Sequence, residues 1–383
     1  MKGTIIYWGN FELPDKNASA NRVVSNGKIF TKLGYRVVFL GSRAASDYFG
    51  GVQKTSFDEN MFEECYPAST KLWLKYVFDI STIKQLIDRF TDTKLVIAYN
   101  IPYSKFSNLK KYLYKKGIPV AYDCTEWNDL TDGNVLKRVY KKLDLFQIKH
   151  FLDKKADGLI VISKRMEQYY KNKNMVRIPP LIDIEDDIWH QPMPNNSDRF
   201  EFCFAGTISN KEALDRIIKA FNQLKINNCY LRIIGLTKQD IQKMYPDLGE
   251  AVNNSHLIFM GQLHHEETVK YVQNCDCYVF LRYDNPRNQA GFPTKFVEAF
   301  SCGVLIITTN VSDVAPYMRK KEDGIIVDSI SYESIEHAMT EITRYSFDTK
   351  ERKRDFDFNN YSDDVHLWIN KIINRGLLDG NTK

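Results

Sequence analysis

Two series of short apolar segments, separated by longer stretches with helical spacing, constrain the fold of this chain more than any other feature. The first series predicts strands at residues 4–8, 36–40, 95–99, 119–122 and 158–162. The second series predicts strands at residues 200–205, 230–234, 256–260, 277–281, 304–308 and 324–327. Strands that alternate with helices form parallel sheets covered on both faces. We therefore predict an α/β protein with two doubly wound domains.

The alternation breaks once, at residues 178–183, where two consecutive prolines interrupt the pattern. The polar segment 192–198 follows and is predicted to be the hinge between domains. We predict a first domain over residues 1–185, a second over residues 186–345, and a C-terminal helical segment over residues 346–383 that crosses back to the first domain. A length of 383 residues exceeds the usual size of a single hydrophobic core, which agrees with two domains.

Charge and composition exclude several classes of protein. The net charge of +5 is too small for this length to indicate nucleic-acid binding. No apolar run approaches the roughly 20 residues that span a bilayer, and the N-terminus does not resemble a signal peptide. The seven cysteines are scattered, which suits reduced, buried thiols in the cytoplasm. Cys275 and Cys277 have no nearby histidine or second cysteine pair, so we predict no metal site.

The segment from Asn285 to Asp328 carries the strongest functional signal. Gly291 and Pro293 mark a loop, and Thr294 is predicted to cap the helix that follows. Free amides at a helix N-terminus attract phosphate, and Lys295 adds a positive charge in the first turn. Glu298 lies about one turn further along, where a carboxylate can accept hydrogen bonds from ribose hydroxyls. The segment therefore predicts a site for a nucleoside diphosphate.

This segment also resembles the donor-binding signature of the retaining glycosyltransferases of family 4 (group 1). That family has two glutamates in this segment, eight positions apart. The second is matched by Glu298 with Ala299, Ser301, Cys302 and Gly303. Ala290 occupies the position of the first. The resemblance implies the GT-B architecture, in which two Rossmann-like domains face a cleft. The variant Gly-Phe-Pro-Thr-Lys at residues 291–295 resembles a subgroup associated with bacterial surface polysaccharide assembly.

The resemblance also assigns residues around the donor. Lys211 ends a segment similar to the family's Gly-to-Lys loop and would hold the diphosphate together with Lys295; the alternative for Lys211 is an exposed lysine near a helix start. The backbone amides at residues 291 and 292 would take over part of the missing carboxylate's role. His264 and His265 are adjacent and therefore point apart, so we predict no metal or acid–base role for them. The full donor-binding set is Gly206, Thr207, Gln262, Leu263, Arg287, Gly291, Phe292, Pro293, Thr294 and Glu298.

In the first domain, Asp123, Glu126 and Trp127 follow a predicted buried strand. Carboxylates bond sugar hydroxyls and an aromatic ring stacks on a sugar face, so these residues predict the site of the acceptor or of the reacting sugar. The alternative is a capping cluster at the strand end. Asn17 and Ser19 precede a predicted helix and either bring its N-terminus to an acceptor or simply cap it.

Residues 137–155 interleave lysines and arginines with apolar residues at helical spacing. This basic amphipathic pattern predicts docking to anionic lipid headgroups. Two alternatives remain: an ordinary solvated face, and an apolar stripe that packs on its own domain.

Together these features predict a cytoplasmic, metal-independent retaining glycosyltransferase without a cofactor, peripheral on the inner face of the cell membrane. Its donor would be a nucleotide diphosphate sugar. Its acceptor hydroxyl would lie on a lipid-linked oligosaccharide in capsule, exopolysaccharide or lipopolysaccharide synthesis. Two alternatives remain open: a catalytically silent homologue that binds a glycan or partner, and a nucleotide-sugar epimerase of similar architecture.

Overall fold

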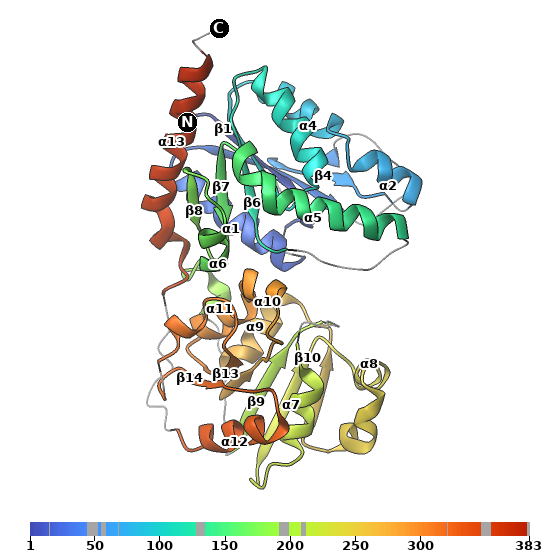
Figure 1. Cartoon of the computed structure of the whole chain (residues 1–383). Helices are drawn as coiled ribbons and strands as arrows, with labels where there is room; N and C mark the ends of the chain where they lie inside the picture. Colours follow the sequence, from blue (N-terminus) through green and yellow to red (C-terminus); the bar gives the residue numbers. More distant parts are fainter. Residues whose placement is uncertain are drawn as a thin grey trace. The chain divides into compact units, whose positions relative to one another are not determined.

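A computed structural model of the chain describes residues 1–14, 16–43, 53–54, 59–67, 69–127, 135–190, 199–207, 212–319, 321–345 and 354–380. The chain divides into two compact units (Figure 1). Unit 1 consists of Met1–Leu181 with Phe358–Lys383, and unit 2 of Ile182–Asp357. The predicted hinge at residues 192–198 lies outside the described residues.

Unit 1 contains an eight-stranded sheet in the order β3-β4-β2-β1-β5-β6-β7-β8. All its strand pairs are parallel except β3 with β4. The strands are β1 (Thr4–Gly9), β2 (Arg36–Arg43), β3 (Gln53–Lys54), β4 (Met61–Cys65), β5 (Thr93–Tyr99), β6 (Val120–Cys124), β7 (Gly158–Val161) and β8 (Met175–Arg177). The five predicted strands are confirmed. The apolar pattern did not indicate β4, which carries two glutamates, or the short β3 and β8.

The helices of unit 1 cover both faces of this sheet. They are α1 (Ala18–Lys32), α2 (Thr70–Tyr76), α3 (Ser81–Arg89), α4 (Tyr103–Tyr114), α5 (Val135–Lys155), α6 (Lys164–Tyr169), the short η4 (Phe358–Tyr361) and α13 (Ser362–Gly380). The C-terminal α13 lies along α1 and β8 (Figure 1). Its residues Val365, Trp368, Ile369 and Ile372 are buried in the unit 1 core. A Cβ at position 158 would collide with the Ile372 side chain, so a glycine suits this close contact with α13.

Unit 2 contains a six-stranded, fully parallel sheet in the order β11-β10-β9-β12-β13-β14. The strands are β9 (Phe200–Ala205), β10 (Cys229–Ile234), β11 (Leu257–Gly261), β12 (Cys277–Val279), β13 (Leu305–Thr309) and β14 (Gly324–Val327). All six predicted strands are confirmed. The helices are α7 (Leu214–Phe221), α8 (Lys238–Met244), α9 (His265–Asn274), α10 (Pro286–Ala290), α11 (Thr294–Ser301) and α12 (Tyr332–Ile342), with the short η1 (Asp187–Trp189), η2 (Pro246–Asn253) and η3 (Ala315–Tyr317).

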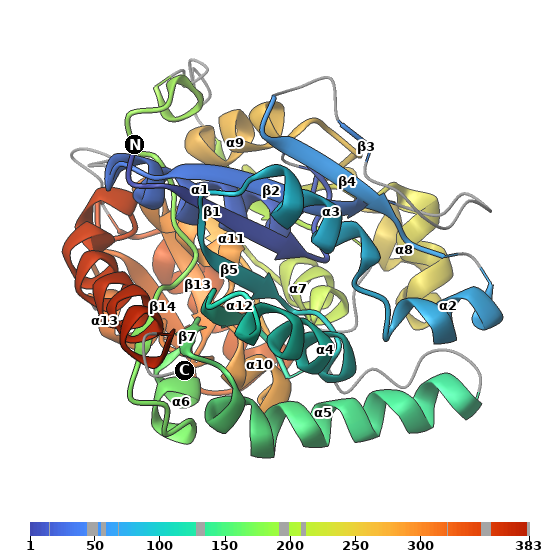
Figure 2. The ribbon, with the colours of Figure 1, turned by 90° about the horizontal axis from the view of Figure 1, so that it is seen from above.

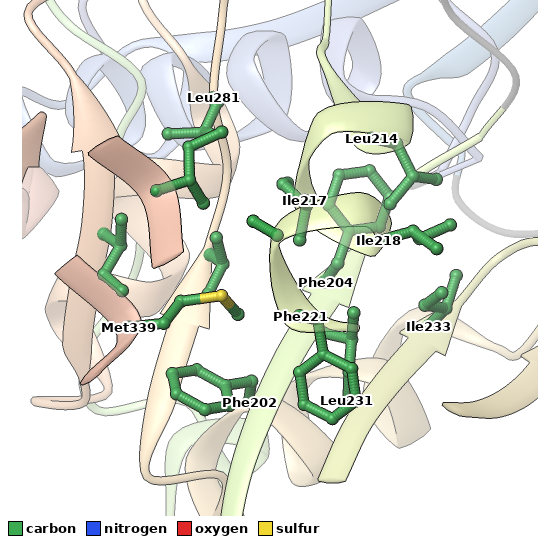
Figure 3. Packing of buried hydrophobic residues seen from close by; sticks show 14 of the residues in the cluster. Phe202, Phe204, Leu214, Ile217, Ile218, Phe221, Leu231, Ile233, Leu281 and Met339 are labelled. Atoms are coloured by element: carbon green, nitrogen blue, oxygen red, sulfur yellow. The ribbon is translucent and has the colours of Figure 1, made fainter. Parts of the chain in front are cut away.

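The core of unit 2 forms where α7 and α12 pack on the sheet (Figure 3). Alternate residues of β9, Phe202 and Phe204, point into this cluster, since successive side chains of a strand face opposite sides. Residues of α7 at helical spacing meet them, namely Leu214, Ile217, Ile218 and Phe221. Burying each such side chain contributes roughly 1.5 to 3 kcal/mol. This packing holds β9 against α7. The strand ends at Ala205, and Gly206 follows it.

Each sheet has a point where its strand order reverses. In unit 1 the strands on the two sides of β1 are β2 and β5, and in unit 2 the strands on the two sides of β9 are β10 and β12. Connections leave these neighbouring strands in opposite directions, which opens a crevice outside their carboxyl ends. Ligand sites of doubly wound sheets are expected there.

Candidate functional site in unit 2

Three glycines bring backbone segments together at the carboxyl ends of β9, β10 and β11. The amide of Gly206 donates to the Ile234 carbonyl at 2.9 Å, and that of Gly235 donates to the Gly261 carbonyl at 2.6 Å. A Cβ on Gly235 would collide with the Gly206 carbonyl, and its φ of +95° also favours glycine. A Cβ on Gly206 would collide with Lys295 Nζ. The lysine ammonium therefore lies directly against the loop that follows β9.

The helix that carries Lys295 starts one residue earlier than predicted. Pro293, not Thr294, is the N-cap residue of α11, and Thr294 is the first helical residue. The prediction of a Thr294 cap is wrong, because the chain reaches helical geometry directly after the proline. Among the described residues, no side chain caps this terminus. Its first amides are therefore available to an anion.

Lys295 belongs to a charged cluster that the sequence analysis did not find. Its Nζ lies 2.6 Å from Glu212 Oε2, and Arg282 Nη2 lies 3.7 Å from Glu212 Oε1. Glu212 is buried, whereas the Lys295 side chain is 20% exposed. Burial lowers the pKa of the Lys295 ammonium, and the Glu212 carboxylate opposes this change. Two cations thus share one carboxylate beside the loop after β9.

Glu298 contacts a histidine rather than a lysine. Its Oε1 lies 3.1 Å from His265 Nε2, and both side chains are about 30% exposed. His265 is the first residue of α9, while His264 is its N-cap and forms a capping box with Glu267. The contact of His265 with Glu298 was not predicted from the sequence. One carboxylate oxygen of Glu298 is thus positioned by a residue from a neighbouring helix.

The loop before α11 is anchored on both sides. Asn285 caps α10 by accepting from the Asn288 amide at 2.9 Å, and Ser312 Oγ donates to the Gly291 carbonyl. The Phe292 side chain is buried among aromatic rings, including those of Phe296, Tyr317 and Phe356. The side chain of Phe292 therefore holds the loop in place and leaves only its backbone for a donor.

The structure places the other predicted donor residues around these elements. Ala290, at the first-glutamate position, is fully buried, and Arg287 is half-buried on α10. Thr207 is exposed after Gly206, and Pro293 is buried at the start of α11. Gln262 is exposed and Leu263 half-buried beyond β11. Lys211 lies outside the described residues, so its role stays a prediction.

The predicted carboxylate of unit 1 has a different environment. Asp123 is fully buried at the end of β6, and Arg22 of α1 donates two hydrogen bonds to it, at 2.9 and 3.2 Å. Tyr7 and Asn26 also donate to this carboxylate. These contacts fit the capping-cluster alternative, because Asp123 is buried and accepts from three side chains of unit 1. A role of Asp123 toward a sugar stays a prediction.

Of the two other predicted residues near Asp123, Trp127 is buried and Glu126 is half-buried. Trp127 is buried; its indole N–H donates to the Tyr170 hydroxyl at 3.1 Å, and Lys149 lies 4.2 Å from the ring centre. These contacts hold the ring within unit 1, and its stacking on a sugar stays a prediction. Glu126 remains half-buried and lines a cavity of unit 1.

At the same edge of the unit 1 sheet, Asn17 caps α1 by accepting from the Ala20 amide at 2.9 Å, and Ser19 is half-buried beside it. For Asn17 the simple-cap alternative holds.

Helix α5 presents two different faces. Leu136, Val139, Leu143 and Phe146 recur every three or four residues and are each more than half exposed. Figure 2 shows α5 alongside α4, and its inner residues contact unit 1. The alternative in which the whole apolar stripe packs on its own domain is wrong for these four residues. Arg138 and Lys142 are exposed beside them.

Residues 185–361 match the family described as glycosyl transferases group 1. This part of the chain is a group 1 glycosyltransferase domain. All features of the unit 2 site described above fall within it. No curated protein matches the chain in sequence.

Solved glycosyltransferase structures share the fold of the whole chain, including its group 1 domain. Sucrose-phosphate synthase from Thermosynechococcus elongatus matches with 14% identity and a TM-score of 0.65, over 98% of both chains. The catalytic domain of starch synthase IV from Arabidopsis thaliana, bound to ADP and acarbose, matches with 9% identity and a TM-score of 0.68, over 98% of this chain and 100% of that one. Anabaena HepE, in complex with UDP and glucose, matches with 12% identity and a TM-score of 0.65, over 96% and 99%. The fold is GT-B.

Among the described residues, no group of three or more histidine, cysteine, aspartate or glutamate side chains is arranged to hold a metal ion. No described helix is both long and apolar enough to cross a membrane.

Proposed function

We propose that this protein is a retaining glycosyltransferase that moves a sugar from a nucleoside diphosphate sugar to an acceptor hydroxyl on a lipid-linked oligosaccharide. One observation carries the proposal: Lys295 lies in the first turn of an uncapped helix, against Gly206, at the strand-order reversal of the group 1 domain. A diphosphate there would meet an ammonium and free amides together. The related structures bound to ADP or UDP support this choice of ligand.

The charged cluster supplies the chemistry that a leaving diphosphate needs. Lys295 and Arg282 share Glu212 when no anion is bound. A diphosphate brings new negative charge to the two cations, which then stabilise it as the glycosidic bond breaks. Glu298, held by His265, would accept hydrogen bonds from the ribose hydroxyls. With alanine at position 290, we propose front-face departure and attack, with the leaving phosphate as the base toward the acceptor.

The outer face of α5 supports a membrane-bound acceptor. Four exposed apolar side chains form one stripe, and Arg138 and Lys142 flank it. Such a face can lie in the headgroup boundary while its basic groups meet lipid phosphate. We therefore propose anionic membrane lipid as its partner.

A binding and turnover experiment tests the donor. We would measure thermal unfolding with UDP, GDP, ADP and dTDP, since a ligand that binds the folded state raises the midpoint. The nucleotide with the largest shift then selects a panel of its sugars for turnover, with and without EDTA. We expect a product with the anomeric configuration of the donor, seen by NMR, in both conditions.

The same experiment separates the rival functions. A catalytically silent homologue would bind nucleotide or glycan without turning over any donor. An epimerase would convert the donor sugar in the absence of an acceptor and form no glycan product. Failure of all four nucleotides to shift the midpoint would refute the donor site.

Liposome sedimentation tests the membrane face. We expect binding to anionic vesicles that weakens as salt rises, because exposed charges are screened. Arg138→Glu with Lys142→Glu should abolish it, whereas Lys238→Glu with Lys243→Glu on α8 makes the same charge change and should not. Equal binding to neutral and anionic vesicles, or none to either, would end this part of the proposal.

A further inference from the structure

A cavity of about 260 Å³ lies inside unit 1, at the carboxyl ends of its strands. Asn10 follows β1 and Asn100 follows β5, so the cavity opens where the strand order of this sheet reverses. Helix α2 and the inner face of α5 complete its walls. Of the residues predicted from the sequence to bind an acceptor or the reacting sugar, Glu126 is the one that lines it.

Aromatic side chains make most of the apolar wall. They are held by contacts within unit 1: the rings of Trp73 and Tyr140 lie edge to face at 5.0 Å, and the Tyr140 hydroxyl lies 2.6 Å from Ser104 Oγ. The Tyr122 hydroxyl donates to the Ile101 carbonyl at 2.6 Å. Rings fixed in this way offer a preformed wall for the apolar face of a ligand. The full aromatic set is Tyr66, Trp73, Tyr76, Tyr122 and Tyr140.

Planar polar groups interrupt this wall. Asn100 has a φ of +45°, and its Oδ1 accepts from the Thr125 amide at 3.2 Å, which fixes its side chain at the rim. Asp144 Oδ1 accepts from the Tyr103 amide at 2.7 Å. A carboxylate can accept about four hydrogen bonds, so Asp144 retains capacity for a ligand. Among the described ion pairs, none includes Asp144.

We propose that this cavity binds one saccharide ring, stacked on the half-buried Tyr140, with its hydroxyls bonded to Asn10, Glu126 and Asp144. The inference rests on the proposed function, since this ring would belong to the acceptor. The volume lies just below the roughly 300 to 1,000 Å³ of pockets for drug-sized ligands, which favours a single ring. An alkyl chain would desolvate Asp144 without offering it a hydrogen bond. A free phosphate would meet two carboxyl groups, Glu126 and Asp144, against one lysine of the lining, Lys141, so the carboxyl groups oppose its negative charge.

Ligand-observed NMR of the full chain without nucleotide tests this site. The probes are the methyl glycosides of glucose, galactose, mannose and N-acetylglucosamine, with adenosine and hexanol as probes of other chemistry. Leu145→Trp places an indole in the cavity, and His150→Trp places the same ring on an exposed position of the same helix. We expect at least one glycoside to bind, at least a tenfold loss in Leu145→Trp, and unchanged binding in His150→Trp.

Several results would overturn the inference: no glycoside binds the wild-type chain, Leu145→Trp binds as well as wild type, or adenosine or hexanol binds in preference. Thermal unfolding checks that Leu145→Trp folds, and Ile148→Phe provides a milder filling variant if it does not. The outcome is separate from that of the proposed function. Glycoside binding without donor turnover would refute the proposed transferase activity and support the saccharide site. Donor turnover with an acceptor KM that Leu145→Trp does not change would support the transferase activity and refute the saccharide site.

Discussion

Each unit has an ion pair that involves a helix beside its sheet, and the two pairs differ in what surrounds them. In unit 1, Arg22 and Asp123 are both at most 3% exposed, and Arg22 also donates to the carbonyls of Ile178 and Pro179. In unit 2, Lys295 and Glu212 meet beside a glycine loop, and the lysine is partly open to solvent. A fully saturated pair leaves nothing for a ligand, so its effect is on stability. A shared, partly open pair can exchange one partner for a phosphate.

The largest effect should come from breaking the closed pair. Arg22→Ala leaves the Asp123 carboxylate buried without its cation and should destabilise the chain by roughly 3 to 5 kcal/mol. Urea unfolding measures the change. Lys32→Ala on the same helix removes only an exposed hydrogen bond to Asn359 and serves as the matched control. Equal midpoints for the two variants would show that the pair is not structural.

A pH titration should reveal a buried carboxyl that lacks a cation. Burial raises the pKa of Asp144 to about 6, against an ordinary value near 4. The folded state therefore holds this proton more tightly, so the stabilising contribution is present at low pH and is lost as pH rises from about 4 to about 6. The loss is at most roughly 3 kcal/mol.

Several polar and titratable groups face Asp144 and influence its pKa. Tyr122 faces it from β6, Tyr140 and Lys141 lie on its own helix, Glu126 lines the same cavity, and α4 contributes the Tyr103 amide. Asp144→Asn keeps the shape without the proton. Its stability relative to wild type should increase across pH 4 to 6, and a flat difference would contradict the raised pKa.

Lys295→Ala should affect ligand binding more than folding, in contrast to Arg22→Ala. Loss of a charged hydrogen-bond partner should weaken binding of the best nucleoside diphosphate by roughly 1.5 to 3 kcal/mol. Glu212 keeps Arg282 at 3.7 Å, so the folded state retains one cation for it. Calorimetry and urea unfolding measure the two effects, with Lys270→Ala on α9 as control. A larger loss of stability than of nucleotide affinity would show that Lys295 and Glu212 have a structural role, like Arg22 and Asp123.

The smallest effect on nucleotide binding should come from substituting Glu298 or His265, the histidine that contacts it. Glu298→Ala should weaken nucleotide binding by roughly 1 to 3 kcal/mol, and His265→Ala by less, because the histidine acts through the carboxylate. The 2′-deoxy form of the same nucleotide provides the decisive comparison. If Glu298 holds the ribose, its loss should matter less for the deoxy ligand; equal losses for both ligands would remove it from the ribose site.

The sequence determined the frame of this protein. Apolar runs with intervening helical spacing place ten of the eleven predicted strands within one or two residues of their observed ends, and β2 continues to Arg43, three residues beyond its predicted end. Such patterns are local, since the period of a strand or helix is set by backbone geometry within a few residues. The donor segment was found for the same reason: its loop, helix start and carboxylate are contiguous.

Only the tertiary structure decided which side chains meet. Lys295 pairs with Glu212 across 83 residues, Glu298 with His265 across 33, and Arg22 with Asp123 across 101. No local period encodes such pairs, because they depend on how whole strands and helices pack. The sequence placed Asp123 at a strand end but could not show that α1 brings a guanidinium to it. It likewise showed a basic amphipathic helix, whereas packing against α4 decided that Leu143 faces outward and Asp144 lines a cavity.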